Sequence, residues 1–346
     1  MCAGKQMSQN AVPPPIDWLD QDIPWHFGNP LNEQKLLIDG HGIVDISNRV
    51  VLSLTGPDRL TWLDSISSHS VANLASGESA TTLILSPHGH IEHELHVISF
   101  DETCFLIAET GSADLLTEYL LKMRFMSQVE IKVETDYKVF FEPIREISDY
   151  PTWLTPLEFG ELGLTKAGSS AGGDQSRYLL ARPARFIGRE VLIPITEVQS
   201  CLSGKEQTGS WAYNAIRIAA GVPRMLDFDH KTLPHEVGFI GPAVHLSKGC
   251  YRGQETVARL HNLGKPPRRL TLLFLEAGDN QLPVKGDLVV LEKENIGVIC
   301  SSVQHFEFGP IALALIKRSA SESETIEVNG QSATQQLIVN PESNRG

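Results

Sequence analysis

The chain has 346 residues, of which 41% are hydrophobic and 21% are charged. This length favours two or three packed units with a sizeable core, and no apolar run approaches the ~20 residues needed to cross a bilayer. The formal net charge of -13 would repel a phosphate backbone over most of the surface. We therefore expect neither a membrane protein nor stable nucleic-acid binding.

The cysteines and the first residues indicate a reducing compartment. Five cysteines are odd in number, widely scattered and without a C-x-x-C pair, which favours reduced thiols over a disulfide framework or a zinc finger. Residues 1–20 lack the basic and apolar regions of a secretory signal. These patterns predict a cytoplasmic protein.

The first half of the chain predicts strands interleaved with helices. Residues 58–67 follow a turn at Pro57 and place Leu60, Leu63 and Ile66 at helical spacing. A second helix, expected within 111–126 with Ser112 as N-cap, places Leu115, Leu116, Tyr119, Leu120 and Met123 on one apolar face. Strands are expected within 49–55, 80–86, 90–100, 103–109, 129–133 and 137–143, with a turn at Pro87-His88-Gly89.

The second half begins with a stretch that lacks periodicity. Residues 148–178 are rich in Pro, Gly and Ser and predict a loop over at least part of their length. A strand is expected within 184–194, and a helix from Ser210 as N-cap to Gly221. Beyond Pro266-Pro267, four short apolar segments separated by turn residues predict a small all-β unit, and the tail from about 341 is expected to fray.

A basic stretch stands out in this acidic chain. Residues 248–269 contain six Lys or Arg and one Glu, a local excess that could focus the electric field on a small anion; a solvated basic face is the alternative. Within this stretch, Lys248 and Arg252 flank Cys250, and a helical run begins at Gln254. Cations and a helix N-terminus lower a thiol pKa and favour a nucleophilic thiolate. A thiol packed behind a glycine turn is the other interpretation of Cys250.

Residues 88–96, HGHIEHELH, form a second unusual segment. On a strand, His88, His90, Glu92, Glu94 and His96 would share one face, while Ile91, His93, Leu95 and Val97 would face the core. Imidazoles and carboxylates two apart can bind a divalent metal, but such a face is more often simply polar, so we expect no metal site.

Two further charged residues lie in apolar surroundings. Arg217, in the helix that begins at Ser210, either snorkels outward or reaches a carboxylate. Glu190, beside Val191, is either an edge residue or a buried acceptor that needs a partner.

Residues 248–255, KGCYRGQE, followed by Ala258-Arg259, resemble the signature of the YgfZ family of folate-binding proteins. The order of the segments at 44–68, 82–97, 187–194 and 216–239 is similar to that of the wider glycine-cleavage T-protein (aminomethyltransferase) superfamily. The resemblance covers about residues 35–340. It implies an α+β fold with an N-terminal extension (1–34), a folate-binding region of two subdomains with a loop at about 148–178 (35–265), a C-terminal β-barrel (266–340) and a tail (341–346).

The resemblance also implies a ligand and a set of site residues. Tetrahydrofolate would sit in a central hole, where Glu190 grips the pterin edge and Arg217 supports the site. Leu85, Glu94 and Arg259 are further expected folate contacts. Cys250 and Lys248 would form the functional motif, together with Gly249, Tyr251, Arg252, Gly253, Gln254 and Glu255.

One departure bears on the reaction. The aminomethyltransferases carry an Asp-Asp pair where this chain has Glu92-His93-Glu94, and their Gly-Glu-Asp-Gly approach is shortened to Phe186-Ile187-Gly188. The first hypothesis is therefore a tetrahydrofolate-binding accessory protein for assembly or repair of iron-sulfur clusters in client enzymes, including tRNA-modifying ones. A folate-dependent aminomethyltransferase or methyltransferase is the second. A non-enzymatic folate-binding interaction protein with a structural Cys250 is the third.

Overall fold

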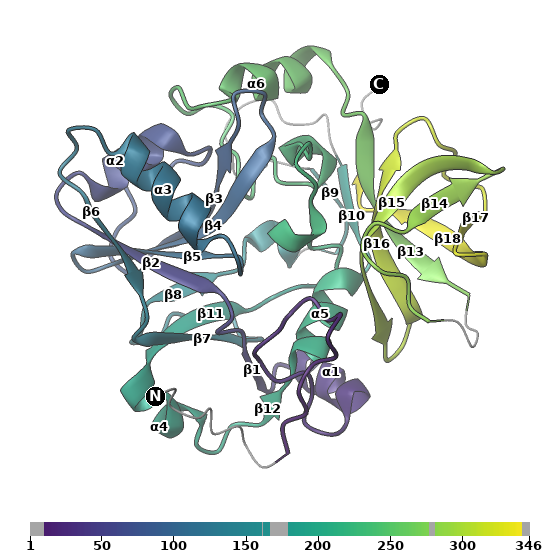
Figure 1. The fold of residues 1–346 in the computed structure, drawn as a ribbon, viewed down its shortest axis with the longest axis horizontal. Helices are drawn as coiled ribbons and strands as arrows, with labels where there is room; N and C mark the ends of the chain where they lie inside the picture. The colour runs from purple at the N-terminus through teal and green to yellow at the C-terminus, as the bar shows by residue number, and fades with distance from the viewer. Residues whose placement is uncertain (1–9, 161, 167–178, 277–280, 341–346) are drawn as a thin grey trace.

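The computed structural model describes residues 10–160, 162–166, 179–276 and 281–340. Two five-stranded sheets, a three-stranded sheet and a closed six-stranded barrel make up its β-structure (Figure 1). No helix within these ranges is long and apolar enough to cross a bilayer. The predicted α+β class with a small C-terminal β-barrel is confirmed.

The first sheet is covered on one face by two helices. Its strands, in spatial order, are β3 (Ser79–Leu85), β4 (Ile91–Phe100), β5 (Thr103–Ala108), β2 (Val50–Thr55) and β6 (Glu130–Glu134). The covering helices are α2 (Arg59–Ile66) and α3 (Ala113–Met123). Leu63, Leu116 and Leu120 from these helices pack against β4 and β5, as their helical spacing predicts. Leu115, predicted on the same face, is 68% exposed, because its position turns it away from the sheet.

A bulge interrupts the pairing of β3 with β4. Ile84 pairs with His93 but Leu85 pairs with Ile91, so Glu92 is the extra residue. The alternation predicted for 88–96 therefore holds only beyond the bulge, where Leu95 and Val97 lie under the two helices. Ile91 was predicted on that face but packs in the central core, because the bulge reverses the direction of its side chain.

The second sheet lies against the first and contains Glu190. Its order is β12 (Gln207–Thr208), β1 (Ile43–Asp45), β7 (Tyr137–Glu142), β11 (Arg189–Pro194) and β8 (Thr152–Leu154). Strands β9 (Gly163–Lys166), β10 (Leu179–Arg182) and β19 (Val339–Asn340) form the small third sheet. β8 and β9 fall inside 148–178, so the loop expected over part of this span does not include those residues; residues 161 and 167–178 lie outside the described part of the chain.

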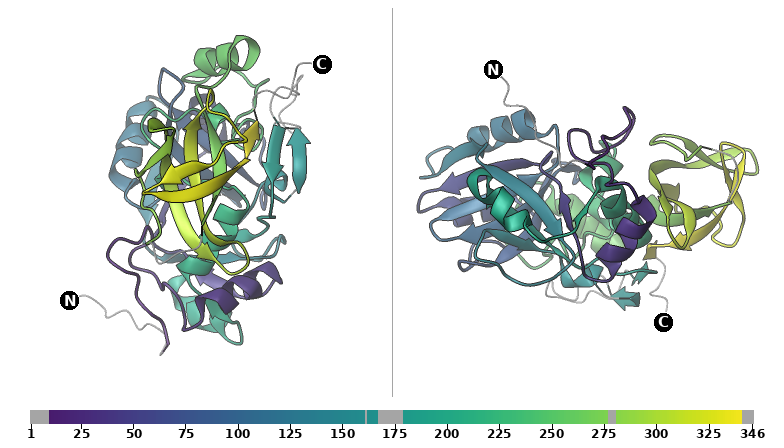
Figure 2. Two further views of the ribbon diagram at one scale, coloured as in Figure 1. Left: turned by 90° about the vertical axis from the view of Figure 1, so that its right-hand side faces the viewer. Right: turned by 90° about the horizontal axis from the view of Figure 1, so that it is seen from below.

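The barrel lies at one end of the molecule (Figure 2). Its strands, in order around the barrel, are β13 (Arg268–Leu275), β16 (Gly309–Lys317), β15 (Glu294–His305), β14 (Leu288–Leu291), β17 (Ile326–Val328) and β18 (Gln331–Leu337). The remaining helices are α1 (Pro30–Ile38), α4 (Val198–Leu202), α5 (Ser210–Ala219) and α6 (Gln254–Leu263). Single 3-10 turns occur at Leu157–Phe159, Ile195–Glu197, Met225–Asp227 and Pro234–Glu236.

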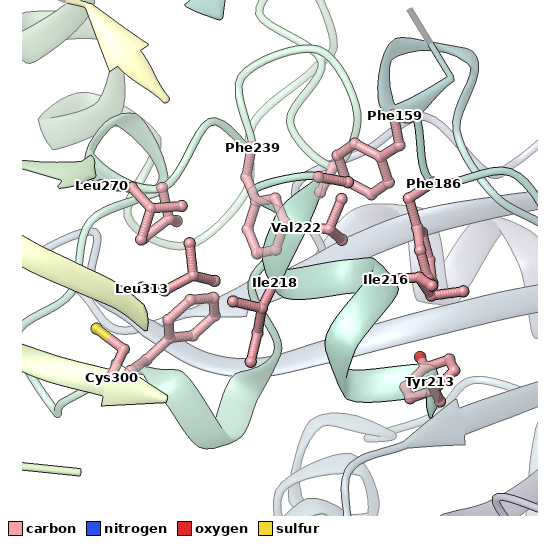
Figure 3. Close-up of a cluster of buried hydrophobic side chains, with 14 of the residues drawn as sticks. Phe159, Phe186, Tyr213, Ile216, Ile218, Val222, Phe239, Leu270, Cys300 and Leu313 are labelled. Carbon is pink, nitrogen blue, oxygen red and sulfur yellow. The ribbon is translucent and has the colours of Figure 1, made fainter. Parts of the chain in front are cut away.

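Helix α5 joins the barrel to the sheets. Figure 3 shows Ile218 directed toward Cys300 and Leu313 of the barrel, while Ile216 lies toward Phe186. Gly209, rather than the predicted Ser210, is the N-cap of α5. A Cβ on Gly209 would lie 2.1 Å from the carbonyl oxygen of Trp25, so close packing of the N-terminal segment explains the glycine. The segment around Trp25 is thus fastened onto the start of α5.

Candidate functional site

The signature segment is a loop that leads into α6 and is fastened to the first sheet and its helices. The Lys248 ammonium donates to the carbonyl oxygens of Asp64 at 2.6 Å, Ser67 at 2.9 Å and His69 at 2.9 Å. Asp64 lies in the last turn of α2 and Ser67 is its C-cap, so the ammonium sits at the helix C-terminus, where a cation is favoured by the helix dipole. Burial lowers the pKa of Lys248, and the nearby Asp64 carboxylate opposes that shift. Lys248 therefore anchors the loop.

Gly253 brings the loop against the turn that joins β3 and β4. Its φ of +83° is left-handed, and a Cβ there would lie 2.5 Å from the carbonyl oxygen of Ser86. The side-chain amide of Gln254 donates to the carbonyl oxygens of Lys248 at 3.1 Å and Gly249 at 3.4 Å. Gly253 and Gln254 thus both hold the loop in shape.

The cations of the basic stretch all have partners. Arg252 bonds to Glu92 at 2.9 Å and lies over the Tyr119 ring, and Arg268 bonds to Asp229 and Glu236. Arg269 is buried and donates to two main-chain carbonyls, and Arg259 pairs with Glu255 at 2.5 Å in solvent. Acids from other segments pair with Lys248, Arg252 and Arg268 and offset most of the positive excess counted from 248 to 269. The field that this stretch directs at a small anion is therefore weaker than the count of charges predicts.

Cys250 is exposed, whereas Cys104 and Cys300 are buried. Burial raises the pKa of Cys104 to about 12 and raises that of Cys300 further, so these two thiols are inert. The interpretation of Cys250 as a packed small hydrophobe does not match its exposure. The expectation that Lys248 and Arg252 hold its thiolate is also not met, because both charged groups bind other partners. The loop presents a thiol without enclosing it.

Glu190 is a buried acceptor, which is one of the two interpretations that the sequence left open for this residue. Its side chain is fully buried, and its Oε2 accepts a hydrogen bond from His96 Nδ1 at 2.7 Å. The His96 ring stacks on the Trp153 indole with centroids 3.6 Å apart and planes 1° apart. Burial alone would lower the pKa of His96, but the Glu190 and Glu94 carboxylates raise it to about 9. His96 is therefore an imidazolium at neutral pH.

Arg217 is fully buried. Of the two predicted alternatives, it reaches a carboxylate and does not snorkel outward. Its guanidinium donates to Asp227 at 2.8 Å and to the side-chain oxygen of Asn214 at 2.7 Å. Asn214 in turn donates to Asp20 at 2.7 Å. Arg217 thus reaches the Glu190 region only through intermediate residues, so the structure gives it a supporting position.

A chain of alternating charges links these residues. Arg224 makes bidentate bonds to Asp20, both at 2.8 Å, and to Glu109 at 2.7 and 3.0 Å. Arg49 lies 3.5 Å from Glu109 and 3.7 Å from Glu190. Burial favours the neutral acid, but the Arg224 and Arg49 guanidiniums lower the pKa of Glu109 to about 2. We call the set from His96 to Asp227 the buried polar network; its members are His96, Glu190, Arg49, Glu109, Arg224, Asp20, Asn214, Arg217 and Asp227.

Sequence reasoning missed most of this network. Asp20, Arg49, Glu109 and Arg224 carry no local signal, because their partners lie far away along the chain. His96 was placed on a polar face, but it is 8% exposed. Its position two residues after Glu94 was the one available hint of an ion pair.

Strand β4 connects the loop to the network. Glu92, at its start, holds Arg252, and His96, four residues on, holds Glu190. Four residues of strand span about 13 Å. Glu94 lies between them, with Oε1 3.7 Å from His96 Nε2. Of the other expected contacts, Leu85 is buried in the central core and the Arg259 side chain is 70% exposed on α6, so the fold does not bring Arg259 to Glu190.

Known proteins share this fold and part of this sequence. Residues 18–140 match the family described as the GCVT N-terminal domain. An aminomethyltransferase of Chromobacterium violaceum is 21% identical over 91% of this chain and 89% of its own length. A mitochondrial iron-sulfur cluster assembly factor IBA57 homolog of Neurospora crassa is 21% identical over 73% of this chain, and the match spans 58% of that relative.

A solved structure shares the fold of this chain. The aminomethyltransferase T of the glycine cleavage system from Bartonella henselae superposes with a TM-score of 0.70 at 18% identity, covering 96% of this chain and 94% of that one. The chain therefore has the fold of that aminomethyltransferase, and its residues 18–140 are similar to the GCVT N-terminal domain family.

Proposed function

We propose that this protein is an accessory factor in the assembly or repair of iron-sulfur clusters, that Cys250 is its working group, and that it binds tetrahydrofolate at Glu190. The observation that carries the proposal is the exposed Cys250 on a loop fastened by Lys248, Arg252 and Gly253. A fixed, accessible thiol suits transient contact with a cluster or a partner protein. The relatives named as iron-sulfur cluster assembly factors support this direction.

The residues around Glu190 fit a reduced pterin in part. Glu190 Oε1 has no hydrogen-bond partner among the described residues, and a buried carboxylate oxygen is a strong acceptor for a ring N–H. The Trp153 indole offers a flat apolar face beside it. Glu190 Oε2 is already taken by His96, so both oxygens become available to a pterin only when His96 moves. A bound tetrahydrofolate would supply a reduced ring that can accept a one-carbon unit.

Within this proposal, Arg217 acts at a distance. It holds Asn214 and Asp227 in place, and these fix the network that ends at Glu190. Arg49 stands 3.7 Å from the same Glu190 oxygen that lacks a hydrogen bond. Burial raises the pKa of Glu190, but the charges of His96 and Arg49 lower it, so the carboxylate is ionised and able to accept.

A folate-dependent aminomethyltransferase is the second candidate, favoured by the aminomethyltransferases that match over most of the chain. Transfer needs a proton-accepting group near the folate. Glu92 is bound to Arg252, and burial lowers the pKa of His93 to about 4. Glu94 is the remaining candidate of the three. The assay is formation of methylene-tetrahydrofolate from a loaded lipoyl carrier. If the protein catalyses this reaction and Glu94→Gln abolishes it, the transferase function is favoured over the accessory role.

Gene deletion tests the accessory role. Loss of the gene should lower the activity of several cluster-containing enzymes, with tRNA-modifying enzymes among the clients, and the wild-type gene should restore it. Unchanged activities across that panel would contradict the role. The relatives named as assembly factors are mitochondrial, whereas the sequence predicts a cytoplasmic protein. Cell fractionation would test the predicted compartment.

Thermal melts test the ligand. Saturating tetrahydrofolate should stabilise the protein by RT ln(1 + [L]/Kd), about 2.7 kcal/mol at a hundredfold excess over Kd. Glu190→Ala should remove the shift. The same shift in wild type and variant would place the ligand elsewhere.

A further inference from the structure

The Glu190 carboxylate already has an occupant that resembles a ligand. His96 presents a flat ring to the Trp153 indole, in parallel planes with centroids 3.6 Å apart, and donates from Nδ1 to Glu190 at 2.7 Å. Trp153 is 2% exposed and Glu190 is fully buried, so the His96 ring is enclosed between them. We call this space between Trp153 and Glu190 the slot. A planar N–H donor stacked on an indole and bonded to a carboxylate is a common way to bind a heteroaromatic ring.

The slot offers more hydrogen-bonding capacity than His96 uses. Trp153 Nε1 and Glu190 Oε1 are buried and make no hydrogen bond among the described residues, although Arg49 lies 3.7 Å from Glu190 Oε1. Buried polar groups in folded proteins are almost always hydrogen-bonded, so these two atoms leave hydrogen-bonding capacity that a ligand other than His96 could use. An imidazole has only one N–H on the edge that faces Glu190, whereas a ring with adjacent donors would satisfy both carboxylate oxygens.

Glu94 is a second carboxylate that the His96 ring could pair with. Its Nε2 lies 3.7 Å from Glu94 Oε1, on the side away from Glu190. The charged groups facing the ring are Glu190 from β11, Glu94 from β4 itself and, through Glu190, Arg49. A shift of the ring toward Glu94 would exchange one carboxylate partner for another, so the imidazolium would keep an ion pair.

We propose that His96 is an internal occupant of the ligand site, and that the site takes a planar ring with adjacent N–H donors, which displaces His96 toward Glu94. The ring class and its identity as tetrahydrofolate rest on the function proposed above; the displacement of His96 does not. The competition makes His96 a specificity-determining residue: a ligand that cannot donate twice to Glu190 gains too little to displace it.

Competition lowers the apparent affinity by the fraction of molecules in which the slot is open. Removing the competitor should therefore strengthen binding. His96→Ala should bind tetrahydrofolate about tenfold more tightly than wild type or better. His96→Gln, which keeps a neutral donor of similar reach and avoids a large cavity, should fall between them.

A folate-free arm tests the slot itself. Imidazole added to His96→Ala should refill the vacated space and raise the Tm saturably, without raising the Tm of wild type. The double variant His96→Ala/Glu190→Gln should lose this rescue, and imidazole should compete with tetrahydrofolate for His96→Ala.

The outcomes separate the two claims. If imidazole fails to stabilise His96→Ala, and His96→Gln binds tetrahydrofolate as wild type does, His96 does not guard a ring site and the inference is overturned. Equal tetrahydrofolate affinity in all three proteins, unaffected by imidazole, also overturns it while leaving folate binding in place. Imidazole rescue with no tetrahydrofolate binding by any variant supports the ring slot and removes folate from the proposed function.

Discussion

The Lys248 ammonium lies 2.6 Å from the main-chain carbonyl oxygen of Asp64 and 3.2 Å from its carboxylate, across 184 residues of chain. This lysine therefore ties the signature loop to the end of α2 rather than acting on the neighbouring thiol. The two roles can be distinguished by measurement. Removing an anchor lowers the stability of the protein, whereas removing a partner of the thiolate changes the reactivity of Cys250.

Lys248→Ala should lower the free energy of unfolding by about 2 kcal/mol, since its three carbonyl acceptors would lose a charged donor. Chemical denaturation would show the loss. Lys122→Ala, on the exposed end of α3, is the control and should change stability by less than about 0.5 kcal/mol. Equal effects of the two substitutions would show that Lys248 does not anchor the loop.

Gly253→Ala should destabilise the protein by more than about 1 kcal/mol, because the residue has a left-handed φ and its new Cβ would meet the Ser86 carbonyl. Gly249→Ala is a matched control in the same loop, where a Cβ would meet nothing within 4 Å. Thermal melts of the two variants should differ clearly. If Gly249→Ala proved the more damaging, the packing of the loop against the turn would be wrong.

Asp20→Asn should cost about 3 kcal/mol or more, since it leaves the buried Arg224 with one carboxylate partner in place of two. Asp17→Asn, three residues earlier and exposed, provides the comparison. Urea unfolding would report both. A stable Asp20→Asn protein would mean that Asp20 is not integral to the buried polar network.

His96 predicts a specific dependence of stability on pH. Its pKa is about 9 in the folded protein and 6.5 ordinarily, so its contribution is fully present below pH 6.5 and is lost as pH rises through about 9. The loss should be on the order of 3 kcal/mol for wild type relative to His96→Gln. Denaturation at several pH values between 6 and 10 measures this difference. A difference that does not change with pH would contradict the His96–Glu190 ion pair.

Local patterns in the sequence predicted the elements well. The helix with Ser112 near its start, the turn at Pro87-His88-Gly89 and the four apolar segments of the barrel all depend on neighbours within a few residues, and all are present. The signature also located a glycine-dependent loop before α6.

The site was less predictable because its partners are distant in sequence. Arg224 meets Glu109 and Asp20 across 115 and 204 residues, and no periodicity encodes such contacts. The same reason explains why the charge of the basic stretch was overestimated. A count of charges between 248 and 269 leaves out its acidic partners, which are Asp64, Glu92, Asp229 and Glu236. The bulge at Glu92 moved Ile91 to the other face, which strict alternation could not foresee.

Rescue of the deletion strain by point variants tests the central claim most directly. Cys250→Ala should fail to restore the activity of cluster-containing enzymes, although the protein accumulates normally, because this thiol is exposed and contributes little to the core. Cys201→Ala, at a partly exposed cysteine on α4, should rescue as wild type does. Full rescue by Cys250→Ala would contradict the account.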